Sequence, residues 1–189
     1  MCGRYSFTRD AGDMAESIVE MMDRRYPGEY KTGEIFPGDT APGVISDNGR
    51  IVPVPAIFGL PGFSDGKLII NARSETAAEK PMFSDSLRDR RIILPASGFY
   101  EWSHDEKKTK YLFTIGGEKL IYLCGVYKIV DGKHRFAILT RDANATMIET
   151  HNRMPIIIRK EHVRTYLTDA SAAIRLIGNA SPILMREAV

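Results

Sequence analysis

Hydrophobic and polar positions follow two different periods along this chain, and each period predicts a different kind of element. Residues 10–26 place Met14, Ile18, Met21 and Met22 at helical spacing, with acidic side chains toward the start. The same kind of spacing predicts shorter helices in three further segments: residues 84–90, 161–167 and 170–178.

β-Rich runs fill the middle of the chain. Asn48-Gly49 separates two such runs, which is a strong hairpin signal. Turn signals at Gly116-Gly117 and Asp131-Gly132 join later runs into successive strands. The predicted strand regions are residues 43–57 (a hairpin), 67–78 (a strand running into a polar turn), 91–103 (two strands with a turn at Pro95 to Gly98), 110–140 and 153–158.

These elements predict an α+β fold in a single domain that covers residues 1–189. The close spacing of the turns favours antiparallel pairing, and no linker divides the chain. We therefore expect a strongly bent, mostly antiparallel β-sheet, or a partly closed barrel, flanked by helices.

Composition and hydropathy indicate a globular protein without membrane spans or a signal peptide. The chain is 43% hydrophobic and 26% charged, which is ordinary for a globular protein, and its formal charge of +2 neither requires nor excludes a nucleic-acid partner. No apolar run approaches the roughly 20 residues that span a bilayer, and charged residues interrupt the stretch where a signal peptide would be apolar. We expect a cytoplasmic protein that does not enter membranes.

The chain has only two cysteines, too few for a disulfide framework or a structural zinc site. Cys124 lies in an apolar run and is predicted to be buried in the core. Cys2 directly follows Met1, so removal of Met1 would leave a free α-amine beside the thiol.

Several polar residues stand where apolar strands end, a common place for functional sites. They are Asn71, Arg73, Glu75, Glu101, Thr140, His151 and Arg153. Taken singly, each is more often a solvated or structural residue than a catalytic one, and local spacing does not decide between these interpretations.

Four motifs appear in order: MCGRY at residues 1–5, INARSET at 70–76, PASGFYEW at 95–102 and THNRMPIII at 150–158. Together they resemble the SRAP (SOS response-associated peptidase) family from Cys2 to about Ile158. The resemblance implies binding of single-stranded DNA that contains abasic sites and a covalent cross-link through the N-terminal cysteine, without cofactor or metal. It also implies a monomer that is associated with the nucleoid if the protein is bacterial.

Matching positions imply four catalytic residues: Cys2 as the nucleophile, Asn71, Glu101 and His151. The same matching implies DNA contacts from Arg4, Arg73 and Arg153 to phosphates and from Thr140 as a site-lining residue. Single-stranded DNA also favours aromatic stacking platforms, for which Phe63, Phe99 and Trp102 are candidates, although aromatic residues in a strand-rich chain usually belong to the core.

The chemistry is consistent with these residue types. A ring-opened abasic sugar presents an aldehyde, with which an α-amine forms a Schiff base, and the adjacent thiolate then closes a five-membered thiazolidine. Glu101 would shuttle protons, His151 would assist sugar opening or reversal, and Asn71 would orient groups by hydrogen bonds.

Three features differ from the family pattern. Glu34 stands roughly where an asparagine is usual, Phe58 and Phe63 stand where tryptophans are common, and the family's C-terminal segment is largely absent. These departures favour one alternative, a non-catalytic module that binds single-stranded DNA. A second alternative is a cysteine peptidase or amidohydrolase of the N-terminal-nucleophile type, which would use Cys2 with its own α-amine or His151 as base. The peptidase and cross-linking functions overlap, because a cross-linking protein of this family would remove its own short N-terminal leader in a peptidase-like reaction.

Overall fold

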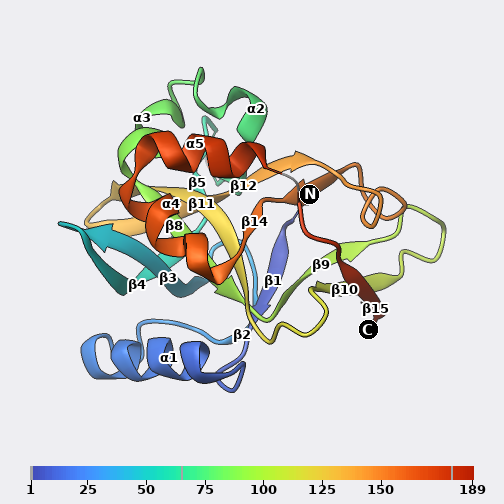
Figure 1. The fold of residues 1–189 in the computed structure, drawn as a ribbon, viewed down its shortest axis with the longest axis horizontal. Coiled ribbons are helices and arrows are strands. Elements are labelled where there is room, and N and C mark those ends of the chain that lie inside the picture. Colours follow the sequence, from blue (N-terminus) through green and yellow to red (C-terminus); the bar gives the residue numbers. More distant parts are fainter. Residues whose placement is uncertain (1, 65, 180) are drawn as a thin grey trace.

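Two β-sheets form the framework of the protein in a computed structural model that describes residues 2–64, 66–179 and 181–189 (Figure 1). Within these residues the smaller sheet is antiparallel throughout and has the strand order β15-β10-β9-β1-β2. Its strands are β1 (Arg4–Phe7), β2 (Gly33–Ile35), β9 (Gly98–Trp102), β10 (Lys110–Thr114) and β15 (Met185–Ala188).

The larger sheet closes into a ring of strands. Its pairings run from β12 through β4, β3, β8 and β11 and return to β12, with β7, β13 and β14 paired at the margins. The members are β3 (Thr40–Asp47), β4 (Arg50–Phe58), β7 (Asn71–Arg73), β8 (Arg91–Ala96), β11 (Ile121–Val130), β12 (Lys133–Asp142), β13 (Arg153–Pro155) and β14 (Ile157–Ile158). The predicted α+β fold with a bent, mostly antiparallel sheet is confirmed, although β12 pairs in parallel with β4 and β7.

Short-range signals explain the elements that the sequence predicted. Asn48 and Gly49 have φ values of 50° and 79°, so both central residues of the β3–β4 hairpin adopt the left-handed conformation that such two-residue turns require.

A small two-stranded sheet, β5 (Leu60–Pro61) with β6 (Leu68–Ile69), follows β4.

Helices cover the outside of the sheets (Figure 1). The apolar face of α1 buries Ala15, Ile18, Val19 and Met22, and this helix packs against β3 and β4. Asp169 caps α5 by accepting a hydrogen bond from the Ala172 N–H at 2.9 Å. The helices are α1 (Asp13–Arg25), α2 (Ser74–Ala77), α3 (Ser84–Asp89), α4 (Val163–Thr168) and α5 (Ala170–Gly178), and a 3₁₀ turn spans Lys160–His162.

Ser97 alone separates β8 from β9, and the chain changes from the ring to the smaller sheet at this residue. Its N–H donates to Ser6 O at 2.7 Å, and its hydroxyl accepts the Thr8 N–H at 3.0 Å. The predicted strand–turn–strand at residues 91–103 is therefore not a hairpin, because β8 and β9 do not pair with each other. The two sheets are held together next to the strand that carries Glu101.

Burial follows the predicted pattern. Cys124 is fully buried, and both cysteines are free thiols. In the described ranges, no helix combines the length and apolar character needed to cross a bilayer.

Candidate active site

Cys2 lies beside Glu101 because β1 pairs with β9. The antiparallel register sets Arg4 opposite Tyr100 and so brings the start of the chain alongside Glu101. Cys2 is fully buried and Glu101 is 5% exposed. Burial raises the pKa of the Cys2 thiol well above its ordinary value, and the neighbouring Glu101 carboxylate raises this pKa further. The thiol therefore needs a base before it can attack. Met1 lies outside the described residues.

Glu101 is a suitable partner for such a proton transfer. Burial raises the pKa of its carboxyl above the ordinary value, although the nearby His104 lowers it. A carboxyl whose pKa is raised toward neutrality gives and takes protons more readily at physiological pH than an exposed one does.

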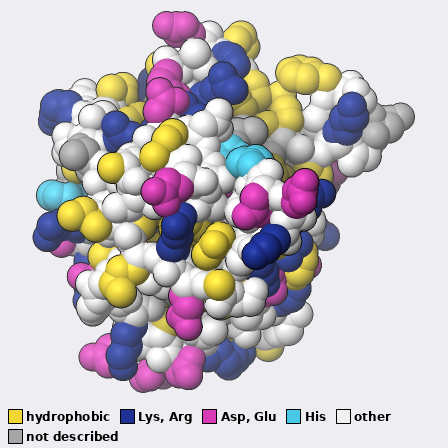
Figure 2. Space-filling model, turned by 90° about the vertical axis from the view of Figure 1, so that its right-hand side faces the viewer, with side chains coloured by type: hydrophobic (Ala, Val, Ile, Leu, Met, Phe, Trp, Pro, Cys, Tyr) yellow, Lys and Arg dark blue, Asp and Glu magenta, His cyan; other side chains and the backbone are white. Residues whose placement is uncertain are grey.

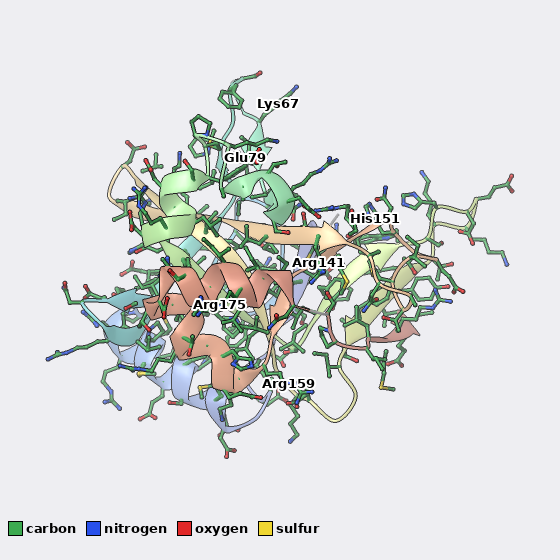
Figure 3. All side chains as sticks on the ribbon, turned by 45° about the horizontal axis from the view of Figure 1, so that its top comes forward. Lys67, Glu79, Arg141, His151, Arg159 and Arg175 are labelled. Atoms are coloured by element: carbon green, nitrogen blue, oxygen red, sulfur yellow. The ribbon has the colours of Figure 1, made fainter. Side chains whose placement is uncertain are left out.

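His151 lies near the end of β12, in the segment that leads into β13 (Figure 3). Its Nδ1 accepts the backbone N–H of Arg153 at 2.9 Å, so a neutral His151 ring carries its proton on Nε2. Burial lowers the pKa of His151, and the positive charge of Arg153 lowers it further, although the backbone hydrogen bond from Arg153 acts in the opposite direction. His151 is thus held as a neutral hydrogen-bond donor at neutral pH.

His104 is a site residue that the sequence reasoning missed. The rings of His104 and His151 have centroids 5.3 Å apart, which joins the turn after β9 to the segment before β13. No motif marks His104, because its approach to His151 joins two segments that are far apart in the sequence.

Asn71 contributes a buried amide. It lies on β7, which pairs in parallel with β12 and sets Asn71 opposite Ile138. Within the described residues, neither the amide oxygen nor the amide nitrogen of Asn71 has a hydrogen-bond partner, and both atoms are buried. Unsatisfied buried amides are costly, so this side chain is suited to a ligand that supplies the missing partners.

Strands β7, β12 and β13 align a second group of predicted residues. Thr140 on β12 stands opposite both Arg73 and Pro155. The guanidinium of Arg153 makes a bidentate ion pair with Glu75 at 2.7 and 2.8 Å, binds Asp142 at 2.6 Å and donates to Thr140 O at 2.8 Å. Arg73 is exposed, whereas Arg153 is 7% exposed.

A side chain that contacts DNA needs a polar group that is exposed and available, and neither Arg153 nor Thr140 has one. Arg153 already binds two carboxylates, and its hydrogen bonds hold the pKa of Glu75 down at about 2. Thr140 has no exposed surface, and its hydroxyl lies 3.4 Å from Ala72 O. Both residues lie at the predicted site, but the structure surrounds them with protein groups.

Arg4 stands in a cluster of cations and aromatic rings on the outer face of the smaller sheet. Its guanidinium lies 4.2 Å from the Phe36 ring centroid and 4.6 Å from that of Trp102. Glu34 binds both Arg4 at 3.1 Å and Lys110 at 2.8 Å. Burial alone would raise the pKa of Glu34, but the hydrogen bonds from Lys110 and Arg4 outweigh it and lower this pKa.

Charges of both signs share one face of the molecule. Figure 2 shows histidine side chains near its middle, with acidic and basic side chains interspersed around them. The candidate aromatics are placed differently from one another, because Phe63 is 91% exposed on the β5–β6 turn whereas Phe99 is fully buried. In the described part of the chain, no group of three or more His, Cys, Asp or Glu side chains is placed to hold a metal ion.

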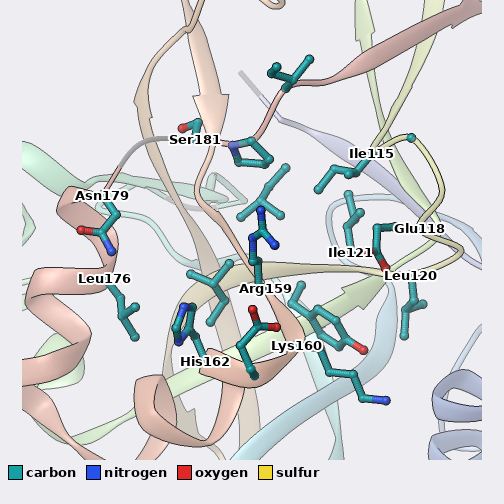
Figure 4. A pocket seen from close by; sticks show the side chains of 17 residues that line it. Ile115, Glu118, Leu120, Ile121, Arg159, Lys160, His162, Leu176, Asn179 and Ser181 are labelled. Carbon is teal, nitrogen blue, oxygen red and sulfur yellow. The ribbon is translucent and has the colours of Figure 1, made fainter.

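A cavity of about 630 Å³ lies elsewhere, between β11, β14 and the segment after α5 (Figure 4). Arg159 and Lys160 line it together with Glu118 and Glu161, so its charges are mixed. None of the predicted site residues lines this cavity.

A model of the SOS response associated peptidase (SRAP) family matches residues 1–183. The chain belongs to the SRAP family. This SRAP protein is 32% identical over 181 residues to the abasic site processing protein YoqW of Bacillus subtilis, covering 88% of this chain and 80% of the relative. It is 27% identical over 179 residues to the abasic site processing protein YedK of Escherichia coli, covering 88% and 79%.

Solved structures share the fold of this SRAP protein. A protein from Bordetella bronchiseptica superposes with a TM-score of 0.77 at 19% identity, covering all of this chain and 99% of the other. A protein from Bacteroides thetaiotaomicron gives a TM-score of 0.75 at 21% identity, covering 100% and 92%. The ring with its attached antiparallel sheet is therefore the architecture of known proteins.

Proposed function

We propose that this SRAP protein binds single-stranded DNA at abasic sites and forms a thiazolidine cross-link through Cys2 after removal of Met1. The observation that carries the proposal is that buried Cys2 lies close enough to the buried carboxyl of Glu101 for its charge to raise the thiol pKa, in a chain whose relatives are named abasic site processing proteins. The site lies where the ends of two sheets meet, so it is supported by rigid elements.

The reaction would begin at the α-amine of Cys2. The amine adds to the aldehyde of the opened sugar, the carbinolamine loses water to give an imine, and the thiolate closes the ring on the imine carbon. Glu101 would give its proton to the departing hydroxyl and, as a carboxylate, then take the thiol proton, steps for which its raised pKa is suited. His151 would donate from Nε2 to a sugar oxygen, and Asn71 would supply its unsatisfied amide to the sugar.

DNA binding would rest on groups around the site that reach solvent, namely the exposed Arg73 and Phe63 and the half-buried Arg4. Arg73 and Arg4 would contact phosphates, and Phe63 would provide a stacking surface. Arg153 and Thr140 would act mainly by holding the ends of β12 and β13 in place, since their polar groups already bind protein atoms. The proposed reaction uses no metal or cofactor. We propose that the protein works as a cytoplasmic monomer with one domain over residues 1–189.

The decisive experiment incubates the processed protein with an abasic oligonucleotide and, separately, with peptide substrates. Intact mass first establishes that Met1 has been removed. We expect a heat-stable DNA adduct from the wild type, none from Cys2→Ala, and single-strand affinity within a few-fold of wild type in that variant, because affinity would come from the arginines.

Three other results would each have a clear meaning. An adduct from Cys2→Ala would contradict the mechanism. Peptide turnover without an adduct would favour the cysteine peptidase, and DNA binding without either product would favour the non-catalytic module. Cys2→Ser should give at most a slow or labile product, because a hydroxyl is a much weaker nucleophile than a thiolate at neutral pH.

A further inference from the structure

His104 lies between solvent and the acid–base groups of the candidate active site. Its ring centroid is 5.3 Å from that of His151, and the two ring planes are inclined by 43°. His104 is exposed, whereas Glu101, three residues earlier on β9, is buried. We infer that His104 carries protons between this site and solvent, an inference that rests on the proposed cross-linking function.

A compact turn holds His104 in this position. The Ser103 N–H donates to Thr109 O at 2.9 Å, and the Thr109 N–H returns a hydrogen bond to Ser103 Oγ at 2.8 Å. Asp105 accepts from the Ser103 hydroxyl at 2.6 Å and from the Lys108 N–H at 3.1 Å. These bonds close the turn on both sides of His104, so its backbone is fixed next to His151.

The proposed reaction requires a route for a proton. An N-terminal α-amine has an ordinary pKa near 8 and is mostly an ammonium at neutral pH. When this ammonium and the thiol combine with an aldehyde, the product is a neutral thiazolidine, the carbonyl oxygen leaves as water, and one proton remains. The proton is released at a buried site and has to reach the solvent.

His151 is poorly placed to accept this proton. Its Nδ1 already accepts the Arg153 N–H, so protonating that nitrogen would break the hydrogen bond that orients the ring. Protonation of His104 leaves the hydrogen bond between Arg153 N–H and His151 Nδ1 intact. The titratable groups that interact with His104 are Glu101 from β9 and His151 from the segment entering β13, and Asp105 is its neighbour in the same turn.

The test measures single-turnover cross-linking by the processed protein with an abasic oligonucleotide, at constant pH and ionic strength and increasing concentrations of imidazole buffer. At low buffer we expect His104→Ala to react more slowly than wild type by on the order of tenfold, within the range of general acid–base effects. Imidazole should restore its rate, whereas the wild-type rate should depend little on buffer. Rescue by a small base is a result that a merely structural role would not produce.

His162→Ala is the matched control, because it removes another histidine that lies in the 3₁₀ turn before α4, and it should behave as wild type. Thermal unfolding of both variants should match wild type. A His104→Ala rate equal to wild type at every buffer concentration overturns the inference, as does a slow rate that imidazole leaves unchanged. If the wild type forms no cross-link at all, the proposed function fails and the inference fails with it, whereas a cross-linking wild type matched by His104→Ala overturns the inference alone.

Discussion

Glu101 shows how burial determines the chemistry available to one side chain. Its carboxyl is 5% exposed, and burial raises its pKa. We predict that Glu101→Gln slows cross-link formation at least tenfold, about 1.4 kcal/mol of barrier, without weakening DNA binding. Glutamine keeps the shape but cannot transfer a proton. Single-turnover time courses at several pH values measure this, and a wild-type rate across the whole range would remove Glu101 from the mechanism.

The same raised pKa predicts how stability changes with pH. Below the unfolded-state pKa of about 4.3, the Glu101 carboxyl is protonated in both the folded and unfolded chains. In this range its titration does not change the free energy of unfolding. Between the unfolded-state pKa and the higher folded-state pKa, the unfolded chain binds fewer protons than the folded one, so folding has to take up a proton and stability falls as pH rises. Above the folded-state pKa, folding has to bury an ionised carboxylate, and the loss of stability is complete.

Glu101→Gln avoids that cost. We therefore predict that the free energy of unfolding of the variant, minus that of wild type, grows as pH rises from acid to neutral. Urea unfolding at several pH values measures the difference. A difference that stays constant, or shrinks toward neutral pH, would show that the folded-state pKa is not raised.

At the scale of elements, β1, β2 and β10 bring Glu34 between two cations. Because Glu34 binds both Arg4 and Lys110, its carboxylate occupies groups that a DNA phosphate would otherwise contact. We predict that Glu34→Gln tightens binding of undamaged single-stranded DNA and steepens the slope of log affinity against log salt, by about 0.7 for each additional phosphate that the protein neutralises.

Glu20→Gln makes the same change in net charge and serves as the control. Glu20 pairs with Arg24 on the exposed face of α1, at 2.7 Å. Fluorescence anisotropy over a salt series measures both variants. If the two behave alike, the effect comes from net charge, and the Glu34 site has no special role.

The paired strands β7, β12 and β13 place Arg73 and Arg153 in different surroundings, for which we predict different roles. Arg73 is exposed and within the described residues makes no ion pair, so Arg73→Ala should weaken DNA binding and lower the salt slope by about 0.7. Arg153→Ala should instead lower the free energy of unfolding by roughly 2 kcal/mol, less than for a fully buried pair because Glu75 and Asp142 reach solvent.

Salt-dependent binding and urea unfolding of both variants separate these tasks. If Arg153→Ala folds with wild-type stability but binds DNA with a shallower salt slope, Arg153 belongs with Arg73 as a DNA ligand. The reverse outcome for Arg73, a loss of stability with an unchanged salt slope, would assign it to the framework.

Elements with local signals could be predicted, whereas contacts between distant segments could not. Asn48-Gly49 specifies its turn through the conformations of two adjacent residues, and α1 follows from the spacing of its own apolar side chains. The short strands β1, β2 and β15 carry no comparable local pattern and form because neighbouring strands supply partners. The strand-end rule marked Glu75 and Arg153, but their ion pair, like the approach of His104 to His151, depends on segments far apart in sequence.

At the scale of the whole molecule, each of the two sheets carries a different part of the candidate site. The smaller sheet carries Cys2's neighbours and Glu101, while the ring carries Asn71, Arg73 and the strand that leads to His151. The proposed chemistry would therefore depend on the ring as a rigid support, because small displacements between the sheets would separate the candidate reacting groups.

Gly125 lies on β11, where this strand pairs with β8 on one side and β12 on the other. A Cβ at this position would meet Ala137 O at 2.9 Å, Leu94 Cδ2 at 2.9 Å and Ile92 Cγ2 at 3.1 Å. The first of these atoms is backbone within the ring and cannot move aside cheaply. We predict that Gly125→Ala lowers the free energy of unfolding by about 1–3 kcal/mol.

Gly178→Ala is the control, because the added Cβ meets nothing within 4 Å at the end of α5. That change should be neutral or slightly stabilising, since alanine favours helix more than glycine by about 1 kcal/mol. Urea unfolding measures both variants, and cross-linking is assayed where each remains folded. Because Ile138 on β12 separates Gly125 from Asn71, the folded fraction of Gly125→Ala should cross-link at the wild-type rate. Wild-type stability in Gly125→Ala would show that the ring yields easily and cannot be the rigid support on which the site depends.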